Sequence, residues 1–287
     1  NDTLIVNIPK NNNKADIPEI YKFEKDISKN FNLSTYKNYK VKSNDNKISF
    51  SLEELSNIIV EFFYALALCH DCSIQEDDEG NEEYIGMSPD SIELIKAAKL
   101  QGYLLTKVES SKYRRLKIEE EIKDFELLNI IPFSSDRKRE SVIVKENNLI
   151  KLYIKGADSI IEPRLSKNSN AEILNQSKNY VNYFSSIGYR TLFVGMKRLS
   201  EEEYKKYAKE LNAANMSLEN KNEKVDQLND KMERDIYLIG TTIVEDKLQD
   251  QVPETIKNLR IAKIKIWMLT GDKMNTAYNI GLSCNLI

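Results

Sequence analysis

The sequence predicts an α/β fold, in which an α+β domain with an antiparallel sheet and flanking helices is followed by a shorter β-α-β-α segment. Three observations predict it. Apolar residues keep a helical period after Ser51, β-rich runs with short polar turns follow from Tyr103, and from Ile236 apolar strands alternate with helical stretches. Hairpin-linked strands build antiparallel sheets, whereas alternating strands and helices are typical of parallel ones.

The composition is that of an ordinary soluble globular protein. The chain has 287 residues, 41% hydrophobic and 30% charged, enough for one large domain or two modest ones. Its 45 acidic and 42 basic residues give a net charge of -3, which argues against a nucleic-acid binder that relies on bulk charge. The longest apolar stretch, Ile58–Leu68, contains Glu61 and is shorter than the roughly 18–20 residues that span a bilayer. Because a signal-peptide pattern is also missing, we expect a soluble piece.

Three cysteines are too few for a disulfide framework. Cys69-His70-Asp71-Cys72 has the spacing of half a zinc site or of a redox pair. It ends an apolar helix, and Cys284 offers no second pair, so we interpret these cysteines as small buried apolar residues. His70 is the sole histidine and has no evident catalytic partner. We therefore expect no metal site built from protein ligands.

The first elements are helical. Residues 1–50 are rich in Asn and Lys and lack a sustained period, which is typical of loops and flexible connections. Ser51 with Glu54 three residues later fits a capping box, and the apolar residues that follow predict a helix. Ser88-Pro89 predicts the start of a second helix, because Ser caps well and Pro suits the first helical position, and Gly102 ends it.

Strands dominate the middle of the chain, and Asn147-Asn148 forms the expected turn of a β-hairpin. The predicted strands are Phe125–Phe133, Ser141–Lys145, Leu149–Ile154 and Tyr189–Met196, with a helix over Ala171–Ser186 between the last two. The stretch 200–234 is predicted to be helical, polar and in part disordered, and its charge run is interpreted as a solvated face.

A second architecture is predicted near residue 236. It comprises strand Ile236–Val244, helix Pro253–Ala262, strand Ile264–Leu269 and helix Met274–Leu286. Such a unit needs further parallel strands to bury both of its faces, and the chain supplies few of them.

Several residues are candidates for ligand binding. Phe133 adjoins a basic segment and either stacks on a purine or is core at a strand end. Lys155 precedes Gly156, whose missing side chain lets a ligand approach the backbone. Arg190 follows Gly188 at the start of a strand and suits a phosphate, or is an ordinary surface residue.

Thr270-Gly271-Asp272 lies where a predicted parallel strand ends and a helix begins. Open α/β sheets place ligands at this edge. Backbone N–H groups and the helix dipole there favour phosphate oxygens. The alternative interpretation is a plain loop.

Four stretches, taken together in their order and spacing, indicate a protein family. They are Phe133-Ser134-Ser135-Asp136-Arg137-Lys138-Arg139, Lys155-Gly156-Ala157-Asp158, Gly188-Tyr189-Arg190-Thr191-Leu192 and Thr270-Gly271-Asp272-Lys273. With these stretches the chain resembles the type IV P-type ATPases, the phospholipid flippases. Further type-specific runs are Asp246-Lys247-Leu248-Gln249, Val252-Pro253-Glu254-Thr255-Ile256 and Ile264-Lys265-Ile266-Trp267-Met268-Leu269. The resemblance extends from about Ser51 to the C-terminus, and residues 200–234 match poorly.

The resemblance implies two domains and a nucleotide site. Residues 1–235 would be the nucleotide-binding domain, and residues 236–287 an incomplete C-terminal part of the Rossmann-like, HAD-like phosphorylation domain. In that family the equivalent of Phe133 stacks on adenine, the equivalents of Lys155 and Gly156 line the same pocket, and that of Arg190 reaches the phosphates. Those of Thr270, Gly271 and Asp272 meet the γ-phosphate end.

The chain departs from the family pattern at two positions. The family usually has Ser-Pro-Asp-Glu where this chain has Ser88-Pro89-Asp90-Ser91, so Ser91 replaces a carboxylate that helps to hold the nucleotide. Glu93 projects from a different side of the helix. One lost hydrogen-bonding partner weakens binding by about 1 kcal/mol. Gln251 stands where the family prefers Gly, which affects only a local turn.

The family's phosphorylated Asp-Lys-Thr-Gly-Thr segment and its Mg²⁺-holding Gly-Asp-Gly-x-Asn-Asp loop do not occur in the sequence. The resemblance therefore implies a chain that binds ATP without turning it over and that contains no catalytic residue. In the intact protein, at the cytoplasmic face of a membrane, ATP with Mg²⁺ would phosphorylate an aspartate upstream of residue 1. Membrane and actuator domains, and possible accessory subunits, would then move phospholipid toward the cytoplasmic leaflet.

Two alternatives are weighed against the flippase reading. One is a regulatory module of flippase ancestry, for example fused to a guanylyl cyclase, and Ser91 favours it slightly. A stand-alone kinase or hydrolase is disfavoured, because a P-loop and a Ser/His/Asp set are both missing. The abundant Asn and Lys are consistent with an AT-rich genome such as that of an apicomplexan.

Overall fold

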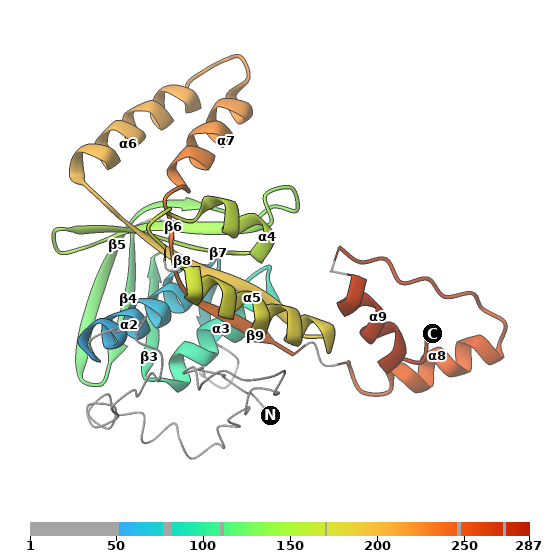
Figure 1. Cartoon of the computed structure of the whole chain (residues 1–287). Helices are drawn as coiled ribbons and strands as arrows, with labels where there is room; N and C mark the ends of the chain where they lie inside the picture. The colour runs from blue at the N-terminus through green and yellow to red at the C-terminus, as the bar shows by residue number, and fades with distance from the viewer. Residues whose placement is uncertain (1–51, 77–81, 110–111, 170, 246–247, 272–273) are drawn as a thin grey trace. The chain divides into compact units, whose positions relative to one another are not determined.

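The computed structural model describes residues 52–76, 82–109, 112–169, 171–245, 248–271 and 274–287 (Figure 1). The predictions for residues 1–50, for the Ser51 cap and for Asp272 therefore lie outside the described residues. The chain divides into two compact units, one of Asn1–Ser169 with Val194–Gly240 and the other of Asn170–Phe193 with Thr241–Ile287.

A seven-stranded sheet is the main feature of the fold, and its spatial order β3-β4-β5-β6-β7-β8-β9 follows the sequence (Figure 1). Its strands are β3 (Tyr103–Glu109), β4 (Tyr113–Ile118), β5 (Glu121–Ile131), β6 (Arg139–Glu146), β7 (Leu149–Gly156), β8 (Arg190–Leu199) and β9 (Tyr237–Val244). From β3 to β7 each neighbouring pair is antiparallel. The predicted β6–β7 hairpin is confirmed, and Asn147 takes the positive φ of 54° that such tight turns require. A separate antiparallel pair joins β1 (Ser73–Glu76) and β2 (Glu82–Ile85).

Two helices of the first unit, α2 (Leu52–Leu68) and α3 (Pro89–Leu100), pack on the sheet. The unit also contains the short α4 (Asp158–Ile161), the 3-10 turn η2 (Glu162–Arg164), α6 (Glu201–Asn215) and α7 (Lys221–Met232). Helix α2 packs against α3, β3 and β7. The predicted boundaries of α3 are confirmed, since the Ser88 hydroxyl accepts from the Ser91 amide at 3.3 Å and Gly102 follows the helix with a φ of 89°.

The core of this unit lies between the end of α2 and the sheet. The α2 residues from Phe63 to Leu68 are at most 3% exposed. Phe63 stacks on Tyr103 of β3, and Tyr64 packs edge-on against Tyr103 and against Phe125 of β5. Aromatic packing of this kind stabilises a domain beyond the area that it buries.

Helices α6 and α7 form a hairpin between β8 and β9 (Figure 1). The helical prediction for 200–234 is confirmed, and Ser200 caps α6 by accepting from the Glu203 amide at 3.1 Å. The interpretation of its charges as a solvated face is confirmed for most of α7, where Lys221, Lys224 and Asp226 are exposed, but it is wrong for Glu233 just beyond the helix. Asn229 is 7% exposed and accepts from the Tyr207 hydroxyl of α6, whereas Glu233 is fully buried and bonds to Arg139 and Ser141 of β6.

The second unit contains α5 (Ala171–Ser186), α8 (Val252–Ile261) and α9 (Met274–Ser283). The predicted strand Ile264–Leu269 is wrong, because the described residues between α8 and α9 are in neither helix nor strand. Trp267 is 83% and Leu269 94% exposed, so much of the apolar run that indicated a strand lies unpacked here. A strand needs a neighbour for its backbone N–H and C=O groups, and no described strand pairs with this segment.

Strand β9 confirms the predicted strand after residue 236, but it belongs to the seven-stranded sheet beside β8. The compact units divide within this strand, between residues 240 and 241. Among the described residues, none of the helices combines the length and the apolar character that a membrane crossing requires.

Candidate functional site

The register of β6 and β7 brings a lysine and a glutamate together at one end of the sheet. Glu140 is the direct cross-strand partner of Lys155, and Arg139 that of Gly156. Because directly opposed residues share a face of the sheet, the side chains of Glu140 and Lys155 lie side by side. They lie on the face covered by α2 and α3, since Lys155 contacts Ser91 of α3 and Tyr153, two residues earlier, bonds to Glu61 of α2.

Lys155, Ser91 and Glu140 form a closed triangle of polar contacts. The Lys155 ammonium lies 3.0 Å from Glu140 Oε1 and donates to Ser91 Oγ at 2.9 Å. Ser91 Oγ in turn donates to Glu140 Oε1 at 3.1 Å. Lys155 is 2% and Ser91 1% exposed, so both are enclosed by protein. A charge buried in this way is stable only when it is paired and hydrogen-bonded.

The Cys-x-x-Cys segment at the end of α2 packs behind this triangle. Cys69 Sγ lies 3.6 Å from the Glu140 carbonyl oxygen and 3.7 Å from that of Tyr153, within reach of a weak hydrogen bond. Burial raises the pKa of Cys69 to about 12 and that of Cys72 to about 11. Such thiols are unreactive. Among the described residues, no three His, Cys, Asp or Glu side chains gather as metal ligands would.

His70 is a neutral structural residue in this segment. Its Nε2 lies 2.9 Å from the Ala67 carbonyl, and its Nδ1 accepts from the Cys72 amide at 3.0 Å, which assigns the proton to Nε2. Burial, followed by the charges of Arg114 and Lys155, holds the pKa of His70 well below its usual value. The Arg114 guanidinium donates to the His70 carbonyl, and burial lowers the pKa of Arg114 to about 10.

Phe133 is exposed, contrary to the interpretation of this residue as core. Its side chain is 58% exposed on the loop between β5 and β6. The loop is a defined turn, because the Ser134 carbonyl accepts from the Lys138 amide at 2.8 Å and Ser134 Oγ accepts from the Arg137 amide at 3.2 Å. The Ala157 amide donates to the Lys138 carbonyl at 3.1 Å and so ties the loop to the end of β7. The structure thus brings Phe133, Lys155 and Ser91 to the same end of the sheet.

Gly156 has a packing role in this arrangement. A Cβ at this position would lie 2.6 Å from Arg139 Cβ and 2.8 Å from the Lys138 carbonyl oxygen. Because Gly156 has no side chain, the start of β6 can pack closely against it. The predicted role of Gly156 in letting a ligand approach the backbone stays a prediction.

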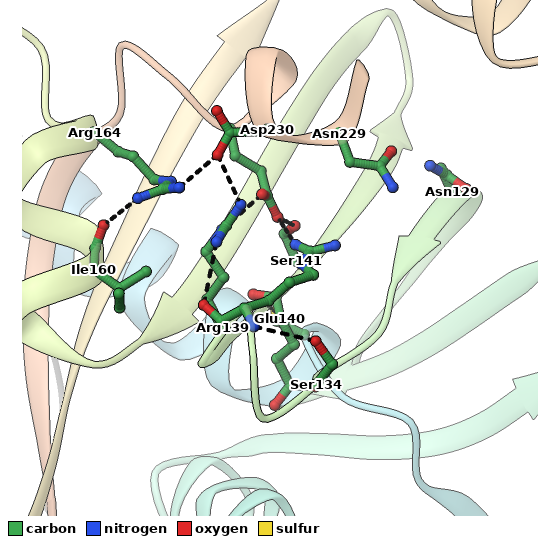
Figure 2. A network of polar contacts seen from close by, with 12 residues as sticks. Asn129, Ser134, Arg139, Glu140, Ser141, Ile160, Arg164, Asn229 and Asp230 are labelled. Atoms are coloured by element: carbon green, nitrogen blue, oxygen red, sulfur yellow. Dashed lines mark hydrogen bonds and ion pairs between the residues drawn. The ribbon is translucent and has the colours of Figure 1, made fainter. Parts of the chain in front are cut away.

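The basic residues of the Phe133 loop are engaged by acidic residues that the sequence analysis did not identify (Figure 2). Arg139 Nε donates to Glu233 Oε2 at 2.7 Å, and Glu233 also receives bonds from Arg137 and from Ser141. A second carboxylate, Asp230, pairs with Arg139 at 3.1 Å and with Arg164. Arg137 and Arg139 thus hold the end of α7 to the loop and the start of β6, and Arg164 holds it to η2.

The second unit carries the remaining predicted site residues. Arg190 begins β8 and is partly exposed, and Gly188 before it has the positive φ of 97° that favours glycine. Thr270 is exposed, and a Cβ at Gly271 would meet no atom within 4 Å. Asp272 lies outside the described residues. A common site of these residues with Lys155 stays a prediction.

Comparisons with known proteins identify the family of this chain. Residues 59–251 match the family model described as P-type ATPase, cytoplasmic domain N. A phospholipid-transporting ATPase of Schizosaccharomyces pombe is 44% identical over 228 residues, which are 79% of this chain and 16% of that protein. Phospholipid-transporting ATPase DRS2 of Saccharomyces cerevisiae is 39% identical over 243 residues, or 84% of this chain and 18% of that protein. Human phospholipid-transporting ATPase ID is 39% identical over 230 residues, or 79% of this chain and 19% of that protein.

The chain spans less than a fifth of the length of each of these three relatives. The family match covers all of the seven-stranded sheet, with Lys155 and Glu140, and the loop of Phe133. The chain therefore belongs to the P-type ATPases, among their type IV members, and contains that family's cytoplasmic domain N.

Proposed function

We propose that this chain is the ATP-binding module of a P-type phospholipid-transporting ATPase. The observation that carries the proposal is the exposed ring of Phe133 on a loop fixed to the end of β7, where the Lys155 ammonium is buried against Ser91. An exposed aromatic ring offers a surface on which a purine stacks, worth about 1–3 kcal/mol per base. Glu140 neutralises the buried cation, and the N-terminus of α3 supplies positive potential nearby.

In this proposal the predicted site residues divide into those that bind the nucleoside and those that bind the phosphates. Phe133 stacks on adenine, while Lys155, Gly156 and Ser91 form the wall of the pocket. Arg190, Thr270, Gly271 and Asp272 meet the phosphate groups. Because the described residues offer no cluster of metal ligands, Mg²⁺ is expected to accompany the phosphates and to be held by other parts of the whole protein.

In the whole protein, the bound ATP would phosphorylate an aspartate outside this chain, and the cycle of phosphorylation and hydrolysis would move phospholipid toward the cytoplasmic leaflet. The names of the relatives support the substrate class. They give no support to the alternative of a regulatory module fused to a cyclase.

Calorimetric titration of the chain with ATP and with GTP tests the proposal. We expect saturable ATP binding with a Kd between about 1 μM and 1 mM, which corresponds to roughly -8 to -4 kcal/mol. Phe133→Ala should weaken it by about 5- to 150-fold, because the stacking surface is lost. Tyr113→Ala is the matched control, since Tyr113 is also exposed, at 45%, but begins β4 outside the loop. Equal ATP binding by the Phe133→Ala and Tyr113→Ala chains would overturn the proposal.

A further inference from the structure

Position 91 lacks the carboxylate that the family pattern places there, yet a carboxylate lies next to it. Glu140 Oε1 accepts from the Ser91 hydroxyl at 3.1 Å and pairs with Lys155 at 3.0 Å. Glu140 comes from β6, whereas Ser91 comes from the first turn of α3, 49 residues earlier in the sequence. Glu93, the nearest acidic residue on α3 that follows Ser91, pairs instead with Lys96 on the exposed side of the helix.

Because successive side chains of β6 point to opposite faces of the sheet, Glu140 lies on the face that carries Lys155 and meets Ser91. Its neighbours Arg139 and Ser141 point to the opposite face of the sheet, toward Glu233. Figure 2 shows Glu140 directed away from the contacts of Arg139 with Asp230. The two acidic sites on either side of β6 are therefore separate, and only the Glu140 side contains Lys155 and Ser91.

The contacts of the triangle involve only one of the two carboxylate oxygens of Glu140. Both the Lys155 and the Ser91 contact go to Oε1. The side chain of Glu140 is 14% exposed and that of Lys155 2%, so Glu140 is the more accessible member of the pair. An incoming group that approaches from solvent thus finds a carboxylate oxygen, which accepts hydrogen bonds and donates none.

We propose that Glu140 supplies from β6 the nucleotide-binding carboxylate that Ser91 does not supply from α3. Its Oε2 accepts a hydrogen bond from the exocyclic amino group of adenine, while Lys155 and Ser91 position the carboxylate through Oε1. This inference rests on the proposed function, because it concerns a base already stacked on Phe133. It assigns to Glu140 the selection of purines that carry a 6-amino group.

A comparison of two ligands tests the inference in the unaltered chain. Purine riboside triphosphate differs from ATP in lacking the 6-amino group, and stacking is retained because the ring system is the same. We expect ATP to bind about tenfold more tightly, as a hydrogen bond to a charged acceptor implies. If ATP binds and the two affinities agree within about twofold, the inference is overturned although the proposed function stands. If ATP does not bind at all, the proposed function fails first.

The second test moves the carboxylate from position 140 on β6 to position 91 on α3. Glu140→Ser should weaken ATP binding about tenfold and bring the two ligands to equal affinity, because the acceptor is lost. The double variant Glu140→Ser with Ser91→Glu restores a carboxylate beside Lys155 from α3, and it should recover ATP affinity to within about threefold of the unaltered chain. A double variant that folds but does not recover, or an equal loss for both ligands in Glu140→Ser, would mean that Glu140 serves only to neutralise Lys155.

Glu61→Gln is the matched control for a purely structural effect. Lys151, also on β7, is 3% exposed and pairs with Glu61 and with Glu146, each at 2.9 Å, so Glu61→Gln removes one of the two carboxylates that neutralise a buried lysine. Glu61→Gln should lower the melting temperature without changing ATP affinity. An affinity loss in this variant as large as that in Glu140→Ser would show that destabilisation alone explains both.

Discussion

Glu233 and Arg139, 94 residues apart in the sequence, form a buried ion pair in which Arg139 Nε donates to Glu233 Oε2 at 2.7 Å. Glu233 is fully buried and Arg139 6% exposed. The pair joins the end of α7 to the start of β6, directly after the loop that carries Phe133. The helical hairpin is therefore part of the support of the candidate site, although its sequence looks like an ordinary charged surface.

Replacing Glu233 by Gln should destabilise the folded chain by about 3–5 kcal/mol, because Arg137 and Arg139 would keep buried charges without this carboxylate. Chemical denaturation followed by circular dichroism measures the change in the free energy of unfolding. Asp226→Asn, at an exposed position on α7, should change it by less than about 0.5 kcal/mol. Similar values for the two variants would contradict the buried ion pair.

His70 should make stability depend on pH below about 6.5. Burial and the nearby charges of Arg114 and Lys155 hold its pKa well below the usual value in the folded chain. The unfolded chain therefore takes up a proton as pH falls through about 6.5 while the folded chain does not, so stability decreases toward acid by up to about 1.4 kcal/mol per pH unit. This contribution is fully present above that pH and is lost progressively below it.

The comparison of wild type with His70→Gln isolates this effect from that of the carboxylates. The difference in the free energy of unfolding should be constant above pH 7 and should shift in favour of the variant as the pH is lowered from 6.5 to 5. Parallel stability curves over the whole range would show that His70 titrates equally in both states.

Gly156→Ala should destabilise the chain by about 1–3 kcal/mol, because the new methyl group would overlap Arg139 and the backbone of Lys138. The main effect is expected in the melting temperature, which differential scanning calorimetry reports. Gly271→Ala is the control, since a Cβ there meets no atom within 4 Å. If Gly156→Ala and the unaltered chain have the same melting temperature, β6 and β7 are farther apart at this point than the structure shows.

Local patterns predicted most of the elements of the first unit. Ser88-Pro89 and Gly102 gave correct ends for α3, and Asn147-Asn148 gave the hairpin, because capping and turn formation depend on neighbours in the sequence. The strand expected at Ile264–Leu269 failed for the opposite reason. A strand exists only beside another strand, and an apolar run contains no information about whether that neighbour is present.

The residues of the candidate site also divide into those that sequence neighbours indicate and those that distant contacts define. Phe133 and Lys155 could be selected from sequence because their flanking residues resemble a family pattern. Glu140 and Glu233 could not, since Glu140 is defined by a cross-strand register and Glu233 by contacts that span more than 90 residues. A glutamate before an apolar strand and a glutamate after a polar helix look like solvated residues until the sheet is assembled.

The order of the large sheet has a consequence for synthesis of the chain. From β3 to β9, each strand lies beside the one that precedes it in the sequence. When a strand leaves the ribosome, its partner has therefore already been made, and the sheet can grow one strand at a time from its N-terminal edge. A sheet assembled in this way does not wait for a distant segment, which shortens the time during which unpaired edges are open to aggregation.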